Sequence, residues 1–320
     1  MSLPSSIERR LSVPAIASPL FIISQPDLVI ATCRAGMIGA FPSLNARPSG
    51  VLEQWLQRLN TELTEEQAPF AVNLIVHRTN TRLYEDLALC VKYRVPIVIT
   101  SLGAREDVNE AVHSYGGMVL HDVIDDVFAR KAIAKGADGI IAVASGAGGH
   151  AGTTSAFALV QEIRTWFDGP LALSGTIASG GSIVAAQAMG ADLAYIGSPF
   201  IATQEAVADD LYKQMITECS SKDIVYSSLF TGVPGNYLKP SIAASGLDPD
   251  NLPSADPSSM NFNPDGGGEA KPWRDIWGCG QGIGAVTEVV PAAERVNQFA
   301  REYREAIARL GVMPQRYRSL

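Results

Sequence analysis

A single histidine stands among glycines in the segment Ala144–Gly152, which reads Ala-Ser-Gly-Ala-Gly-Gly-His-Ala-Gly. Glycines such as Gly148 and Gly149 let a backbone approach a planar or phosphorylated ligand closely, because no side chain intervenes. The imidazole of His150 could then remove or hold a proton near neutral pH. A lone histidine is often only a surface or core residue, but this position between glycines indicates a functional role.

Small residues also follow the last two apolar runs of the repeating pattern. One segment, Ser-Gly-Thr-Ile-Ala-Ser-Gly-Gly, begins at Ser174, and the next run ends at Gly197-Ser198. In α/β barrels a phosphate site is typically built from the backbone N–H groups that follow strands seven and eight. Gly175, Thr176, Gly197 and Ser198 are therefore candidate phosphate-binding residues. The alternative is that these glycines only make tight turns.

Two further polar residues lie in apolar runs. His121 is either a ligand contact or a polar residue satisfied inside the fold, and Asn73 is either a cofactor contact or a structural hydrogen-bond donor. The chain has no GxGxxG after its first strand, no Walker motif, no GxSxG and no HExxH. Acidic residues do not cluster at the predicted strand ends, so we expect no catalytic metal. A phosphate grip beside a histidine suits a phosphorylated cofactor.

These residues must be positioned by a regular alternation of short apolar runs and amphipathic helices. Glycines end helices at Gly136 and Gly190 and a strand follows each at once, as in parallel sheets with right-handed crossovers. Eight units favour a closed (β/α)8 TIM barrel over an open doubly wound sheet. The expected strands are Pro14–Ser18, Met37–Ser43, Phe70–Val76, Val95–Ser101, Gly117–Val123, Gly139–Ala144, Pro170–Ser174 and Leu193–Gly197.

The alternation stops after Tyr212, and Ser241–Lys271 is rich in Pro, Gly, Asp, Asn and Ser. A long irregular segment in a compact chain is commonly a lid. Helical periodicity returns over residues 292–310. We therefore expect the barrel over residues 1–204, a partly helical cap over 205–281, and a C-terminal helix, within 282–320, that packs back on the barrel.

The composition is that of a globular enzyme, with 47% hydrophobic and 18% charged residues among 320. The net charge of −8 and the pI near 5.1 oppose a nucleic-acid partner. We find no apolar run that could span a bilayer and no signal peptide, so no membrane association is expected. The four cysteines lie far apart without a CxxC pair, which fits a reducing cytoplasm.

Taken together, the motifs resemble those of the nitronate monooxygenase (2-nitropropane dioxygenase-like) flavoproteins. The resemblance covers the whole barrel, with agreement in order and spacing from Pro14 to Ala206. It rests on Gly-Gly-His at 148–150, Asn73 within Phe-Ala-Val-Asn-Leu, Ser174-Gly175, the run Gly-Ala-Asp-Leu-Ala-Tyr-Ile-Gly-Ser-Pro-Phe-Ile-Ala-Thr from Gly190, and Gly-Gln-Gly at 280–282.

This resemblance implies that FMN lies across the barrel mouth, with its phosphate at the four small residues named above. His150 would face the flavin as the active-site base or as a substrate-orienting group. Gln281 would approach the same pocket from the cap. The other residues implied at the cofactor are Ala17, Ser18 and Pro19 under the isoalloxazine ring, Asn73 as its hydrogen-bond partner, and His121, Gly148 and Gly149.

Three positions depart from the family pattern. Val143 stands where members often have glutamine, and Asp122 stands beside His121 where a lysine or related polar residue is expected. The segment Phe230–Asn236 lacks arginines that many relatives carry. These differences leave the flavin site intact but leave the substrate open.

The resemblance implies FMN-dependent oxidation of nitronates or nitroalkanes by O2 to a carbonyl compound and nitrite. The nearest alternative is an NAD(P)H-dependent FMN reductase on the same scaffold, of the enoyl-acyl-carrier-protein or quinone reductase type. The cap argues against that alternative, because Lys239 is its only basic residue between Phe230 and Lys271. Several acidic side chains there would repel a dinucleotide if this loop folds over the mouth, namely Asp248, Asp250, Asp256 and Asp265. The alternative is that the loop points into solvent and its charge has no effect.

Two alternatives come from other classes of protein. A cofactor-free phosphosugar isomerase or aldolase would need a catalytic Lys or Glu at a strand end, which we do not find. A non-catalytic flavin- or phosphate-binding protein remains open. The expected partners are thus a small substrate and O2, and the sequence leaves a homodimer possible.

Overall fold

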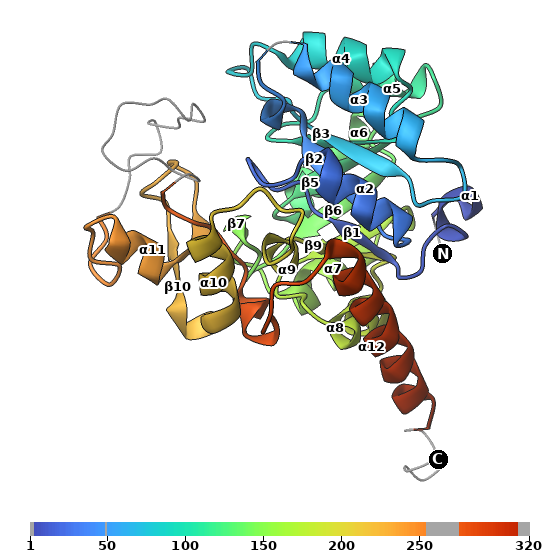
Figure 1. The fold of residues 1–320 in the computed structure, drawn as a ribbon. Coiled ribbons are helices and arrows are strands. Elements are labelled where there is room, and N and C mark those ends of the chain that lie inside the picture. Colours follow the sequence, from blue (N-terminus) through green and yellow to red (C-terminus); the bar gives the residue numbers. More distant parts are fainter. Residues whose placement is uncertain (1–2, 49, 254–274, 313–320) are drawn as a thin grey trace.

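The computed structural model describes residues 3–48, 50–253 and 275–312 (Figure 1). Eight parallel strands form a closed barrel in the order β1-β2-β3-β4-β5-β6-β8-β9, and β9 pairs with β1. Each strand lies within a run expected from the apolar pattern, so the (β/α)8 barrel is confirmed. The strands are β1 (Ala15–Ala17), β2 (Ile38–Pro42), β3 (Phe70–Ile75), β4 (Ile97–Ser101), β5 (Met118–Val123), β6 (Gly139–Val143), β8 (Leu171–Ser174) and β9 (Leu193–Ile196).

Alternate residues of these strands pack on opposite sides of the barrel wall. One apolar cluster fills the barrel interior and includes Ile16, Ile38, Ala71, Ile99, Leu120 and Leu193. Their neighbours pack outward in the larger cluster against the helices. Because side chains along a strand alternate with a period of two, the residue two positions after an inner residue also faces inward. Asn73, Ser101, Asp122 and Tyr195 therefore form part of the uppermost inner layer.

Helices surround the barrel, and the last one, α12 (Ala292–Val312), packs against α8 and α2 (Figure 1). Gly180 permits the close approach to α8, since a Cβ there would lie 2.2 Å from the backbone nitrogen of Tyr303. The Glu302 carboxylate also accepts a 2.7 Å hydrogen bond from the Gly180 N–H. The other helices around the barrel are α1 (Ser5–Glu8), α2 (Pro26–Arg34), α3 (Val51–Glu62), α4 (Leu83–Lys92), α5 (Glu106–His113), α6 (Asp126–Ala134), α7 (Ala156–Arg164), α8 (Gly180–Met189) and α9 (Ser198–Ile201), with a 3-10 turn at Ser43–Asn45.

A second, three-stranded sheet stands at the mouth of the barrel. The strands β10 (Ile224–Ser227) and β11 (Gly235–Leu238) pair antiparallel, and β11 also pairs with β7 (Gly149–His150). The glycine-rich loop around His150 is thus tied to the segment predicted as a cap, which contains strands as well as helices. The remaining elements of that region are α10 (Asp210–Glu218), α11 (Lys239–Ala244) and the 3-10 turns Ser221–Asp223 and Gln281–Ala285.

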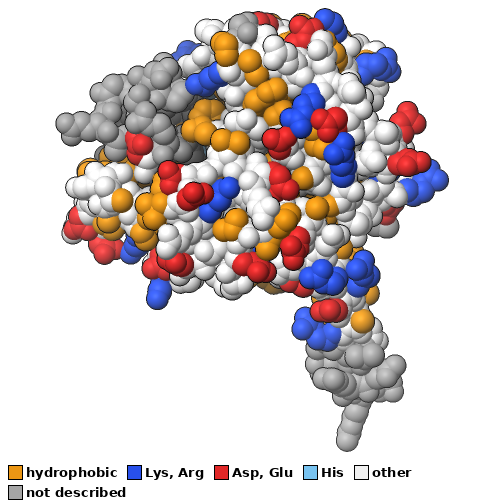
Figure 2. All heavy atoms as spheres, viewed as in Figure 1, with side chains coloured by type: hydrophobic (Ala, Val, Ile, Leu, Met, Phe, Trp, Pro, Cys, Tyr) orange, Lys and Arg blue, Asp and Glu red, His pale blue; other side chains and the backbone are white. Residues whose placement is uncertain are grey.

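The surface in Figure 2 carries acidic and basic side chains intermixed over the helices. Such mixing produces little field of a single sign on this face. Within the described ranges, no helix is both long enough and apolar enough to cross a membrane.

Candidate active site

A cavity of about 850 Å³ opens where the barrel strands end, beneath the three-stranded sheet. Eleven of the thirteen residues expected at the site line it: Ser18, Pro19, Asn73, His121, Gly148, Gly149, His150, Gly175, Thr176, Gly197 and Ser198. Ala17 is buried in the outer core cluster instead, and Gln281 is exposed while its neighbours Gly280 and Gly282 line the cavity. The volume lies within the range of cofactor pockets.

Four small residues, Gly175, Thr176, Gly197 and Ser198, form a cup at the ends of β8 and β9. Their backbone N–H groups have no acceptor among the described residues. Added bulk does not fit, because a Cβ on Gly197 would lie 2.7 Å from the Ser18 hydroxyl oxygen and one on Gly175 2.9 Å from the Ser145 carbonyl oxygen. Backbone donors without acceptors in a space lined by small residues suit a phosphate.

The backbone of this cup is held in an uncommon conformation. Gly175 has φ +132° and Thr176 has φ +59°, the left-handed region that non-glycine residues rarely occupy. Such strain persists only where surrounding contacts enforce it, and it concentrates at ligand sites. The Ser198 hydroxyl oxygen accepts a 2.7 Å bond from the Gly280 N–H, which leaves the hydroxyl hydrogen as a donor.

His150 lies in β7, and its Nε2 is 2.8 Å from the hydroxyl of Thr231. Thr231 Oγ1 is also 3.1 Å from the carbonyl oxygen of Val233. A proton on Nε2 satisfies both contacts, because the hydroxyl then donates to Val233 and accepts from His150; this tautomer puts the basic lone pair on Nδ1. Burial lowers the pKa of His150 to about 4. The imidazole is therefore neutral at pH 7 and can act as a base.

The glycines before His150 are required by packing against the cap segment. A Cβ on Gly148 would lie 2.7 Å from the backbone nitrogen of Gly280, and one on Gly146 would lie 2.3 Å from the Thr176 hydroxyl. The Gln281 N–H also donates to the Gly146 carbonyl at 2.9 Å. Gly148 therefore lines the cavity and packs against Gly280, whereas Gly146 packs against the Thr176 side chain and is not part of the lining.

The floor of the cavity is the inner-layer group Asn73, Ser101, Asp122 and Tyr195. Asn73 Nδ2 donates to the Ile99 carbonyl at 3.1 Å and to Ser101 Oγ at 2.8 Å, and the Ser101 hydroxyl donates to Asp122 Oδ2. Both amide hydrogens of Asn73 are thus used within the protein. A ligand can meet only its Oδ1 acceptor.

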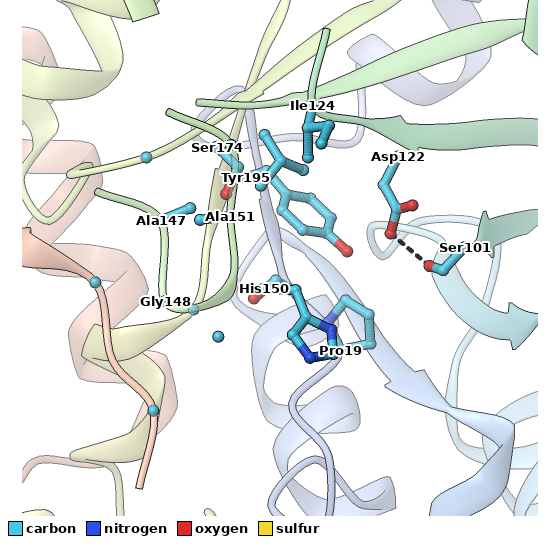
Figure 3. Close-up of a pocket in the computed structure, with 18 of the residues that line it drawn as sticks. Pro19, Ser101, Asp122, Ile124, Ala147, Gly148, His150, Ala151, Ser174 and Tyr195 are labelled. Carbon is cyan, nitrogen blue, oxygen red and sulfur yellow. Dashed lines mark hydrogen bonds between the residues drawn. The ribbon is translucent and has the colours of Figure 1, made fainter. Parts of the chain in front are cut away.

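Tyr195 lies opposite the hydrogen-bonded side chains of Ser101 and Asp122, and its hydroxyl is directed toward them in Figure 3. Burial raises the pKa of Tyr195 well above its usual value, and the Asp122 carboxylate contributes. Burial also raises the pKa of Asp122 to about 6, with the Ser101 hydrogen bond opposing this shift. Neither residue was among those expected at the site, although the period of the β5 and β9 patterns places both inward.

His121 faces the helix side of β5, opposite to Asp122, because it shares the register of the outward residues Val119 and Val123. Its Nδ1 lies 2.6 Å from Thr100 Oγ1. Burial, aided by Lys135, lowers its pKa to about 4. The cavity continues over this edge of the barrel.

Two lysines that the sequence analysis did not single out line that part of the cavity. Lys131 and Lys135 are one helical turn apart at α6, and neither forms an ion pair with a described residue. Lys135 Nζ donates to the Ala104 carbonyl at 2.9 Å, and Lys131 Nζ lies 5.4 Å from the Phe128 ring centroid. Lys239 of the cap is instead paired with Asp250 at 2.6 Å. Among the residues that the structure describes, the lysines that line the cavity thus come from the barrel.

The described residues contain no group of three or more His, Cys, Asp or Glu side chains arranged to hold a metal ion. The cysteines are unpaired thiols. Burial raises the pKa of Cys33 to about 12 and that of Cys90 further still, so both are inert apolar side chains.

Comparison with known proteins gives consistent matches over most of the chain. A putative monooxygenase of Mycobacterium tuberculosis is 28% identical over 72% of this chain, which spans 65% of that protein's length, slightly under two thirds. A nitronate monooxygenase of Paraburkholderia phytofirmans is 25% identical over 93% of this chain and 94% of its own length. The solved structure of nitroalkane oxidase from Streptomyces ansochromogenes has a TM-score of 0.79 and 25% identity, covering 96% of this chain and 100% of that one.

The family model described as nitronate monooxygenase matches residues 9–302. This range holds all eight barrel strands, the cup, His150 and about half of α12. The chain therefore belongs to the nitronate monooxygenase family.

Proposed function

We propose that this protein binds FMN and oxidises nitronates or nitroalkanes with O2 to a carbonyl compound and nitrite. One observation carries the proposal: a cup of unused backbone donors and a neutral histidine line the same cavity at the barrel mouth. Members of this family are flavoproteins, and the cup fits the phosphate of FMN. We treat residues 205–281 as a cap over this cavity.

When bound, FMN supplies the electron transfer between substrate and O2. The protein's own residues bind the cofactor, orient the reacting groups and remove the proton. The cup would hold the phosphate, and Asn73 could offer its Oδ1 to a donor on the cofactor's ring. Neutral His150 takes the α-proton of a neutral nitroalkane, and Thr231 holds its imidazole in orientation. A preformed nitronate has already lost that proton.

The first test is the absorbance spectrum of the purified protein, with FMN and riboflavin affinities measured by fluorescence quenching. We expect a yellow protein with about one FMN per chain, and much weaker binding of riboflavin, which lacks the phosphate. Nitrite release with O2 consumption on adding a small alkyl nitronate then tests the reaction. A colourless protein that binds neither flavin would reject the proposal.

A second candidate is the NAD(P)H-dependent FMN reductase, and Lys131 and Lys135 favour it. The sequence argument against a dinucleotide relied on the scarcity of basic residues in the cap. Lys131 of α6 and Lys135 at its C-cap instead supply two cations at the cavity edge, and these could meet the pyrophosphate of a dinucleotide. Of the four aspartates expected to repel it, Asp256 and Asp265 lie outside the described residues, and Asp250 is paired with Lys239.

A further inference from the structure

Asp122 is the one carboxylate among the described residues that line the cavity. It comes from β5, two residues after the inner-core residue Leu120, so the barrel geometry itself places it in the floor. Its assigned partner is the Ser101 hydroxyl, and no described Lys, Arg or His forms an ion pair with it. An uncompensated carboxylate in a partly closed cavity acts strongly on any charged ligand nearby.

The hydrogen-bond direction adds to this effect. Asn73 donates to Ile99 and Ser101, and Ser101 donates to Asp122. The side-chain donors of Asn73 and Ser101 are therefore all used within the protein. Asn73, Ser101 and Asp122 offer a ligand only acceptor atoms, namely Asn73 Oδ1 and the Asp122 carboxylate. The Tyr195 hydroxyl is the one donor left in this group, and it is directed toward Asp122 in Figure 3. An anionic head group at Asn73 and Asp122 would therefore meet negative charge and lone pairs.

We propose that Asp122 determines substrate charge selectivity at this site: as a carboxylate it disfavours anions such as nitronates and favours neutral nitroalkanes. This inference rests on the proposed function for the identity of the substrates. It gives Asp122 and His150 separate roles toward a substrate that exists as a neutral nitroalkane or an anionic nitronate. Asp122 selects the neutral form, and His150 removes the proton that this form still carries.

The pKa values of Asp122 and of the other titratable groups that face the cavity indicate the pH range over which this selectivity operates. Burial raises the pKa of Asp122 to about 6, so its charge develops between pH 5 and 8. His121 and His150, with pKa values of about 4, are neutral across that interval, and burial raises the pKa of Tyr195, Tyr212 and Tyr226. Lys131 and Lys135 are cationic groups at the edge, and His77 lies at the rim after β3. His77 is a further residue of the lining with a titratable side chain, so it needs a control of its own.

Nitrate is a suitable probe because it is planar, unreactive here and anionic at every pH used. Its binding is followed by the rise in the thermal unfolding midpoint, which needs no bound flavin, and by the flavin absorbance shift in FMN-loaded protein. Chloride at equal ionic strength corrects for screening. We expect wild-type protein to bind nitrate at least tenfold more tightly at pH 5 than at pH 8. The Asp122→Asn variant should bind nitrate with affinities at pH 5 and pH 8 that differ by no more than about twofold.

Two control variants distinguish Asp122 from general charge effects. His77→Gln should retain the pH dependence, and so should Asp168→Asn, which removes a carboxylate from an exposed loop outside the cavity. At pH 8, Asp122→Asn should also raise the ratio of kcat/KM for nitronate to that for neutral nitroalkane at least tenfold. Unchanged pH dependence in Asp122→Asn, or its loss in His77→Gln, would overturn the inference. Absence of flavin binding and turnover with the nitrate result intact would reject only the proposed function.

Discussion

The imidazole Nε2 of His150 and the hydroxyl Oγ1 of Thr231 lie 2.8 Å apart, although 81 residues separate them in the chain. This contact joins the glycine-rich loop after β6 to the turn between β10 and β11. The adjacent pairing of β7 with β11 fixes the same two segments through their backbones. The position of the proposed base therefore depends on the segment from β10 to β11 as much as on the barrel.

Replacing His150 with Asn tests its role as a base. FMN should remain bound, because the cup lies on other loops. Turnover of neutral nitroalkanes should fall by roughly 10²–10⁴-fold, the usual contribution of a general base. Steady-state rates on a nitroalkane and on its preformed nitronate provide the measurement. The nitronate should suffer less, and equal losses on both forms would instead assign His150 to substrate orientation.

Replacing Thr231 with Val removes the hydroxyl that orients the imidazole. We expect kcat for neutral nitroalkanes to fall about tenfold, consistent with the loss of one hydrogen bond to a partly buried group. The FMN dissociation constant should not change. Thr231→Ser is the matched control, since it keeps the hydroxyl and should recover most of the rate. A rate in Thr231→Val equal to wild type would show that the contact is not needed for catalysis.

Variants of Gly175 test whether the cup binds the phosphate of FMN. Alanine here must adopt φ +132° and place its Cβ 2.9 Å from the Ser145 carbonyl oxygen, so FMN affinity should fall at least tenfold. Gly175→Glu should abolish binding, because it adds bulk and negative charge at the proposed phosphate position. The control is Gly116→Ala, which has φ +85° but nothing within 4 Å of the added Cβ. Equal FMN affinity in Gly175→Ala and Gly116→Ala would exclude the cup as the phosphate site.

Flavin reduction should come from the organic substrate and not from NADH or NADPH. Anaerobic mixing of the FMN-loaded protein with a small alkyl nitronate, with NADH and with NADPH is followed by bleaching of the flavin absorbance. Rapid bleaching by a nicotinamide and none by the nitronate would favour the reductase function. In that case Lys131→Ala with Lys135→Ala should slow the nicotinamide reaction, whereas Lys239→Ala, at a lysine already paired with Asp250, should not.

The buried His121 should make stability depend on pH. Its pKa is about 4 in the folded protein and about 6.5 when unfolded, so the unfolded state binds more protons between these values. The free energy of unfolding should therefore decrease as pH falls from 6.5 to 4, by roughly 3 kcal/mol at most from this residue.

Urea unfolding of wild type and His121→Gln at pH 7 and pH 4.5 checks this expectation. The loss of stability on acidification should be smaller in the variant. Asp122 acts in the opposite direction, because its raised pKa makes the folded state bind the extra proton, so Asp122→Asn should increase the acid sensitivity. Identical pH profiles in wild type and His121→Gln would contradict the assignment.

The sequence by itself determined the barrel and most of the predicted residues that line its mouth. Alternating apolar runs and helix-ending glycines marked all eight strands, because strand and helix periods are local properties of the chain. Barrel geometry then placed the residues after those strands at one end, which brought His150 and the cup into one cavity.

Only the tertiary structure decided what those residues contact. The β7–β11 pairing, the approach of Gly280 to Gly148 and the lysines of α6 at the cavity edge all join segments distant in sequence. The tertiary structure also decided the position of Asp122. The sequence pattern indicated its neighbour His121 as the candidate site residue. Strand alternation turns one side chain toward the helices and the other into the barrel, and the barrel's closure determines which of the two is inside.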